Sequence, residues 1–289
     1  MTLKKQFLFS LIIIYALTQT ISAQDTNLKL QKFTAHNKGK YFAAFGGNRD
    51  SYTTSDIHFK GNNFDFTVSN AEAHDKPKGW HVDYINPGRF TIPQTNMKFG
   101  YFVSDHYCVA LNIDHMKYIF AQNQTANVTG TINLPASEPG SIHNGTYNNT
   151  PVDFTDGTFL KFEHTNGLNY VHAEVSRFDD ISKLFKLGNT DKFQINVTEG
   201  IGAGFLYPRT DATVLENKEH DEFHIAGYGL SAKAGLNFNF FKYFFIQTEL
   251  KAGYINMPDI QITYDNSEKA SQHFLFFEST IYFGFIFKV

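Results

Sequence analysis

The chain has 289 residues, of which 42% are hydrophobic and 16% aromatic, and its formal net charge is −3. The acidic balance excludes charge-driven binding of nucleic acid. The single cysteine, Cys108, excludes an internal disulfide and a zinc site of paired cysteines. Beyond residue 23 no stretch approaches the roughly 18 consecutive apolar residues that a transmembrane helix needs.

The first residues have the layout of a secretory signal peptide. Lys4 and Lys5 precede an apolar run at 7–17, and Ala23 offers a small residue before a cleavage point. The run is too short to span a bilayer as a helix. We therefore predict a signal peptide over residues 1–23, whose removal takes away two lysines and lowers the net charge from −3 to −5.

Eight later segments alternate apolar with polar or small residues, which is the period of a β-strand. They are residues 40–48, 96–103, 107–120, 158–178, 193–206, 223–240, 244–257 and 271–289. In 223–240 the even positions include Leu230 and Phe238, and the odd positions include Lys233. Because a lysine facing lipid costs about 2–4 kcal/mol near the midplane, we expect the apolar faces to point outward. Glu199 falls on an apolar face, a conflict that a bulge or an interfacial position would remove.

The last strand is the most informative. Phe283, Phe285, Phe287 and Val289 share one face, which carries no charge. An exposed strand this apolar would template aggregation in a soluble protein, whereas a closed barrel in lipid pairs both of its edges. The Phe-x-Phe-x-Phe-x-Val pattern resembles the terminal strand of bacterial outer-membrane β-barrels, most of which end in Phe rather than Val.

The resemblance implies an all-β fold, a closed antiparallel up-and-down transmembrane barrel in the outer membrane of a Gram-negative bacterium. It also implies that the barrel assembly machinery is a partner. We expect eight strands, with ten to twelve as the alternative, over residues 39–289, preceded by a periplasmic lead-in at 24–38.

Strand parity sorts the connections into two sets. At one end of the predicted barrel lie the shorter connections, 104–106, 179–192 and 241–243. At the other end lie the longer connections, 49–95, 121–157, 207–222 and 258–270. Short periplasmic turns and long extracellular loops are typical of these barrels. Within the first long loop, 57–59 and 64–66 predict a hairpin above the membrane, or alternatively two further barrel strands.

The predicted interior carries many charged side chains. They are Lys98, Asp114, Lys161, Glu163, His172, Glu174, Lys233, Glu249, Lys251 and Glu278. Buried charges must pair to offset the cost of desolvation. We therefore expect an ionic plug that closes a lumen already narrow in an eight-stranded barrel.

One segment suggests chemistry. Residues 161–170 contain His164 followed by Thr165 and are similar to the His-x-Ser-Asn motif of outer-membrane lipid A deacylases and phospholipases. That similarity implies a lipid hydrolase in which His164 activates a hydroxyl. The order differs here, because Thr165 follows His164 directly and adjacent strand residues point to opposite faces. The other interpretation is a bulge or turn at residues 164–167.

The sequence favours a structural or surface-interaction role over the hydrolase or a narrow solute channel. The expected partners are outer-membrane lipids, lipopolysaccharide and an extracellular ligand or envelope protein. No cofactor or metal site is predicted from the spacing of histidines and acids.

Overall fold

The structure is a computed structural model that describes residues 36–79, 81–85, 94–218 and 222–289. The predicted signal peptide and residues 24–35 of the predicted lead-in lie outside the described residues. Among the described residues, no helix is long and apolar enough to cross a membrane.

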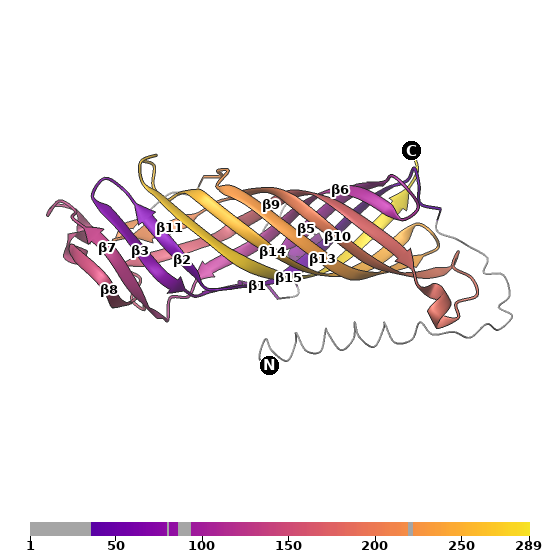
Figure 1. The fold of residues 1–289 in the computed structure, drawn as a ribbon, viewed down its shortest axis with the longest axis horizontal. Helices are drawn as coiled ribbons and strands as arrows, with labels where there is room; N and C mark the ends of the chain where they lie inside the picture. The colour runs from indigo at the N-terminus through magenta and orange to yellow at the C-terminus, as the bar shows by residue number, and fades with distance from the viewer. Residues whose placement is uncertain (1–35, 80, 86–93, 219–221) are drawn as a thin grey trace.

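Eight long strands form an antiparallel ring (Figure 1). They are β1 (Tyr41–Tyr52), β5 (Thr95–Phe102), β6 (Tyr107–Phe120), β9 (Leu160–Asp180), β10 (Phe193–Pro208), β13 (Gly227–Phe240), β14 (Phe244–Gln261) and β15 (Lys269–Phe287). Each pairs with the next, and β1 pairs with β15 from Tyr41↔Phe287 to Tyr52↔Phe276. The predicted eight-stranded barrel is confirmed, although the strand predicted to start at 223 starts at Gly227.

The outer face of the ring is apolar, as alternation predicts. Leu111 and Ile201 are each 68% exposed, and Phe283, Phe285 and Phe287 also face outward. Glu199 lies on this outer face without a bulge, opposite the exposed Arg177. An apolar belt around a ring with no free edge is the arrangement that a bilayer requires.

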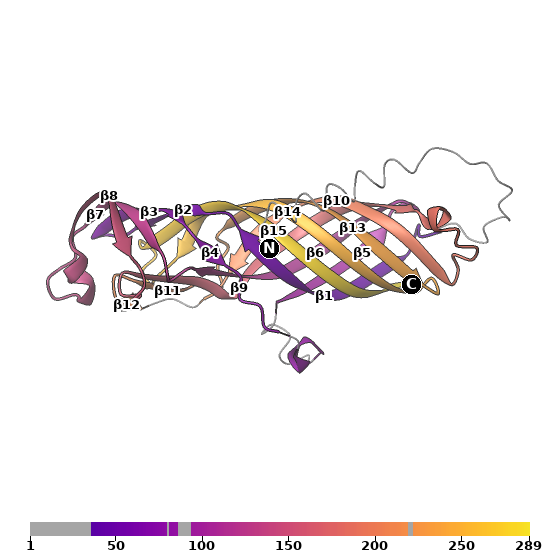
Figure 2. The same ribbon diagram turned by 90° about the horizontal axis from the view of Figure 1, so that it is seen from below.

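The two ends of the ring differ. The turn end carries the short connections at 103–106 and 241–243 and the C-terminus, and the loop end extends into further strands (Figures 1 and 2). These are β2 (Ser55–Lys60), β3 (Phe64–Ala71), β4 (Ala73–His74), β7 (Thr125–Ile132), β8 (Gly145–Asp153), β11 (Asp211–Val214) and β12 (Asn217–Lys218). Short 3-10 helices lie at Val82–Ile85, Pro139–His143 and Ser182–Phe185.

The predicted hairpin above the membrane is confirmed as β2 and β3, which pair antiparallel. It does not enlarge the ring, because its pairing with β15 is confined to Lys269–Gln272, at the outer end of that strand. β3 then pairs with β7, and β7 with β8. The alternative of ten or more barrel strands is therefore wrong for the ring, and the extra strands form a sheet that projects beyond it.

Candidate functional site

Aromatic side chains fill the lumen at the turn end. Phe42, Phe102, Phe178 and Phe245 are buried and lie on the inward faces of β1, β5, β9 and β14. The ring of Phe102 lies 5.3 Å from those of both Phe42 and Phe178. Cys108 is buried in the same cluster, so its thiol has the packing role of a small apolar side chain.

Further toward the loop end, the lumen contains a layer of paired charges, named here the ionic layer: Lys98, Asp114, His172, Glu174, Lys233, Glu249, Lys251 and Glu278. All of these side chains are buried. Glu174 accepts from Lys98 at 3.2 Å and from Lys233 at 2.9 Å. The two lysines also contact Glu249, at 2.7 Å from Lys98. These four residues come from β5, β9, β13 and β14, so their contacts tie together strands that are not neighbours in the ring.

A second group in the ionic layer is centred on Asp114. Lys251 contacts Asp114 and lies 3.1 Å from Glu278, while His172 Nε2 lies 2.9 Å from Asp114 Oδ2. Asn96 Nδ2 donates to Asp114 Oδ1 at 2.7 Å. Carboxylates buried with this many donors are held in fixed positions, which suits a structural role.

Two residues of the predicted interior set lie elsewhere. Lys161 is exposed and Glu163 is partly exposed, and Glu163 accepts a hydrogen bond from the Thr165 hydroxyl at 2.8 Å. The even-numbered residues of β9, from Leu160 to Phe178, are the ones that face inward where the strand is regular. The prediction that Lys161 and Glu163 line the lumen is wrong because both are odd-numbered.

An aromatic core closes the loop end. The inner face of the projecting sheet packs against the outer ends of β6 and β9, with Phe59 5.7 Å from Phe162 and Phe66 5.5 Å from Phe159. Tyr118 from β6 joins the same core. From the turn end to the loop end, the lumen is thus filled first by aromatic side chains, then by the ionic layer and then by aromatic side chains again.

His164 lies inside this core rather than at an accessible rim. Its side chain is fully buried, with the rings of Phe162 and Tyr118 at 4.9 and 5.7 Å. Gln272 Nε2 donates to His164 Nε2 at 3.4 Å, so Nδ1 carries the proton and donates to Thr210 Oγ1 at 3.1 Å. The partner hydroxyl therefore belongs to Thr210, which sequence analysis did not identify, and Thr165 points away to Glu163.

The bulge at residues 164–167 explains this geometry. In the β6–β9 pairing, Met116 faces Leu168 and Tyr118 faces His164, so β9 carries two extra residues there. Gly167 has a φ of +130°, a conformation that L-residues rarely adopt. The interpretation of this segment as a bulge is confirmed, and the even number of extra residues keeps His164 on the inward face.

The outer face of the projecting sheet is polar and nearly uncharged over β7 and β8. Thr125, Thr129 and Thr131 alternate along β7 with the buried Ala126, Val128 and Ile132, and are exposed. Thr131 lies opposite the exposed Thr146 of β8. Strand parity predicts a loop at 121–157, whereas the structure has β7 and β8 there. The apolar residues at 126, 128 and 132 are the alternation that indicates β7.

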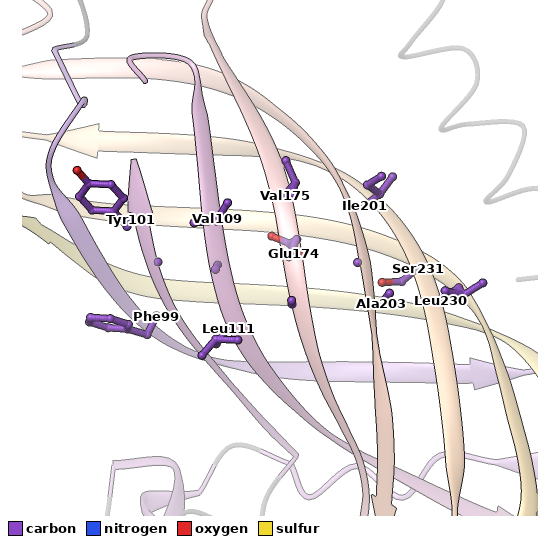
Figure 3. Close-up of a pocket in the computed structure, with 14 residues that line it drawn as sticks. Phe99, Tyr101, Val109, Leu111, Glu174, Val175, Ile201, Ala203, Leu230 and Ser231 are labelled. Carbon is purple, nitrogen blue, oxygen red and sulfur yellow. The ribbon is translucent and has the colours of Figure 1, made fainter. Parts of the chain in front are cut away.

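A shallow hollow of about 660 Å³ lies on the outer surface of the ring. Ala173 and Ala203 line it. Leu111, Ile201 and Leu230 also line it, and they are labelled with Ala203 in Figure 3. The register places Leu111, Ala173, Ala203 and Leu230 in one row across four strands. Small residues between large ones account for the hollow, which belongs to the apolar belt.

A ring of eight antiparallel strands, with an apolar belt outside and polar side chains inside, defines an outer-membrane β-barrel protein. No protein-family model matches the chain, and no curated protein matches it. Among the described residues, no group of three or more His, Cys, Asp or Glu side chains is placed to hold a metal ion.

Solved structures similar to this chain are themselves bacterial outer-membrane proteins. OprG from Pseudomonas aeruginosa is 12% identical with a TM-score of 0.35, over 88% of this chain and 99% of that one. Ail, the attachment invasion locus protein of Yersinia pestis, is 13% identical with a TM-score of 0.28, over 84% and 99%. Neisserial surface protein A is 9% identical with a TM-score of 0.28, over 84% and 97%. Likeness at these levels carries no argument about activity.

Proposed function

We propose that this protein is a surface-interaction protein, in which the barrel is an anchor and the projecting sheet is the binding element. The observation that carries the proposal is the exposed threonine and asparagine face of β7 and β8, backed by the hydrophobic core that the sheet shares with the outer ends of the barrel strands. A sheet buried on one face and polar on the other is stable outside the membrane without a further partner.

The filled lumen favours this role over a channel. A solute would have to displace Phe102 and its neighbours at the turn end, the ion pairs of Glu174 and Glu249, and Phe162 at the loop end. Separating a buried ion pair costs several kcal/mol, about 3–5 when one partner is removed. We therefore expect no conductance steps when the purified protein is inserted into planar lipid bilayers, and steady channels would refute the closed lumen.

The chemistry of the exposed face indicates a neutral polyhydroxylated partner, and the saccharide part of lipopolysaccharide is our choice. Hydroxyl and amide groups both donate and accept, which matches the hydroxyl groups of sugars. Thr125, Thr131 and Thr146 are exposed, and their hydroxyls make no hydrogen bond within the described residues. They lie on the projecting sheet, at the end of the molecule opposite the C-terminus (Figure 2). Because these barrels have short periplasmic turns and long extracellular loops, we expect this end to face the saccharide chains.

The test is binding of the detergent-purified protein to immobilised delipidated lipopolysaccharide saccharide. Replacing Thr125, Thr131 and Thr146 together by Ala should weaken binding by about tenfold or more, since each hydrogen bond contributes roughly 0.5–1.5 kcal/mol. The variant should unfold at the same temperature as the unaltered protein, because these hydroxyls serve no internal contact. Ser267→Ala, in an exposed loop outside the sheet, is the control. Binding that is absent, or unchanged in the triple variant, would contradict the proposal.

A further inference from the structure

The connection between β9 and β10 presents apolar side chains at the turn end, beyond the strands of the ring. It contains the short helix Ser182–Phe185, in which Leu184 is 51% exposed and Phe185 is 53% exposed. The turn between β13 and β14 adds Phe241 and Tyr243, each 66% exposed. We name these four side chains the turn-end patch. Large apolar side chains gathered on an exposed surface commonly mark a contact with a membrane or another protein.

Ser182 holds this short helix against the barrel wall. Its side chain is fully buried, and its hydroxyl accepts a hydrogen bond from the Ile195 backbone N–H of β10 at 2.9 Å. The Ser182 backbone N–H donates to Asp180 Oδ1 at 2.8 Å. In Figure 1 the helix lies beside the turn end, to the side of the ring rather than across its opening. Leu184 and Phe185 are therefore displayed in a fixed position at the side of the barrel.

The two connections that form the turn-end patch contact each other. The Phe241 backbone N–H donates to the Lys192 carbonyl at 3.0 Å, and Lys242 Nζ lies 3.1 Å from Asp191 Oδ2. Phe241 and Lys242 have φ values of +54° and +70°, in the left-handed region that Gly and Asn favour in turns. Residues held in this conformation against their preference concentrate at functional positions.

A row of aromatic rings joins the turn-end patch to the apolar belt. Phe193, Phe240, Phe244 and Phe285 lie opposite one another on β10, β13, β14 and β15. The centroids of successive rings are 5.1, 5.9 and 5.4 Å apart. Because Phe285 belongs to the belt, the surface that meets acyl chains continues as far as the turn that carries Phe241.

Lysines without acidic partners lie in the same connection. Within the described residues, three exposed lysines of this connection form no ion pair: Lys183, Lys186 and Lys192. The acids nearby are mostly paired, since Asp179 lies 2.7 Å from Arg177 and Asp191 lies 3.1 Å from Lys242. Only Asp180 remains, and it accepts hydrogen bonds from a backbone N–H and an amide. The connection therefore presents three unpaired positive charges against one negative charge.

An anionic phospholipid has the chemistry that matches both features. Its acyl chains would cover the turn-end patch, and its phosphate would lie among the lysines, which bind phosphate as point charges. Tyr243 has the apolar ring and polar hydroxyl typical of side chains at the level of lipid headgroups. Since short turns of these barrels face the periplasm, the lipid would belong to the inner leaflet.

We propose that the turn-end patch and the three lysines form a binding site for anionic phospholipid of the inner leaflet. The helix would then enter the headgroup region as a short interfacial element and fix the depth of the barrel in the bilayer. This site is separate from the saccharide binding proposed for the projecting sheet, which lies at the other end of the molecule (Figure 2).

Tryptophan fluorescence of the full chain, refolded into phosphatidylglycerol vesicles, tests where the helix lies. The single tryptophan, Trp80, is first replaced by Phe, and Phe185→Trp or Leu184→Trp then places a reporter on the helix. Either reporter should be quenched by lipids brominated on their acyl chains and shielded from acrylamide in the water. Ser267→Trp, in an exposed loop at the loop end, is the control and should show the opposite behaviour.

Lipid retention tests the role of the charges. The protein is refolded in an equimolar mixture of phosphatidylglycerol and phosphatidylcholine, extracted in mild detergent and examined by native mass spectrometry. It should retain phosphatidylglycerol preferentially, and replacing the three lysines together by Gln should lower that preference by about tenfold or more. The matched control replaces three exposed lysines at the loop end by Gln and should keep the preference: Lys60, Lys161 and Lys218.

Three results would each overturn the inference. The first is that acrylamide quenches the reporter at 185 as strongly as the reporter at 267. The second is that the variant without the three lysines keeps the lipid preference of the unaltered protein. The third is that cross-linking in vesicles shows a second copy of the chain covering the turn-end patch.

Discussion

The Lys98 ammonium lies 2.7 Å from the Glu249 carboxylate, although the two residues are 151 positions apart and sit on strands that do not pair. β5 and β14 are separated in the ring by β1 and β15. The contact therefore crosses the lumen. It belongs to a closed set in which Lys233 and Glu174 complete the pairing.

This crossing contact predicts a large loss of stability when one charge is removed. Lys98→Met should lower the free energy of unfolding by about 3–5 kcal/mol, because Glu174 and Glu249 are then left with one lysine between them. Urea unfolding of the purified protein, followed by tryptophan and tyrosine fluorescence, measures the change. Lys161→Met, on the exposed face of β9, should change it by no more than about 0.5 kcal/mol. If the two variants lowered the free energy of unfolding equally, the stabilising role of the ionic layer would be contradicted.

The apolar belt predicts a penalty of a different kind. Leu111 is 68% exposed on the outer face of β6, so Leu111→Arg would place a guanidinium in acyl chains at a cost of about 2–4 kcal/mol. Refolding into lipid vesicles at a series of urea concentrations measures this cost. Ile142→Arg, also well exposed but beyond the ring on the Pro139–His143 helix, should refold as the unaltered protein does. A neutral Leu111→Arg would mean that this face does not meet lipid.

Much of the barrel could be predicted because a strand's period of two is a local property. Alternation alone placed Lys233, Glu249 and Lys251 inside and Ile201 outside, as the structure has them. It could not say that Lys98 would meet Glu249, since that contact depends on ring closure and on the stagger of strands.

The projecting sheet and the burial of His164 were harder to predict, for separate reasons. The Thr, Asn and Gly content of β7 and β8 is typical of a loop, and their apolar face is only a few residues long. The burial of His164 in a core could not be predicted, because nothing local indicates how far the strands continue beyond the membrane.

The pairing of β1 with β15, which closes the ring, should depend on Gly46. A Cβ atom at this position would lie 2.1 Å from the Ile281 carbonyl oxygen of β15, so a side chain would separate the two strands that close the ring. We expect Gly46→Val to prevent closure. In unheated electrophoresis gels the variant should then migrate as the unfolded form, whereas the unaltered barrel keeps a distinct folded band. Gly79→Val, where a Cβ meets nothing within 4 Å, should keep the folded band.

Burial of His164 predicts that its loss affects stability and leaves membrane lipids unchanged. In His164→Leu, Thr210 and Gln272 each lose a buried partner, and an unsatisfied buried polar group costs about 1–3 kcal/mol. His58→Leu, at a partly exposed pair with Asp65, should cost less than about 1 kcal/mol. Mass spectrometry of lipid A from cells with the unaltered gene, without the gene and with His164→Leu should give one acylation pattern. If the unaltered gene alone changed that pattern while His164→Leu stayed folded, His164 would be catalytic and the barrel a lipid hydrolase. The enclosure of its imidazole by Phe162 and Tyr118, with an amide in place of an orienting carboxylate, is the physical reason to expect the opposite.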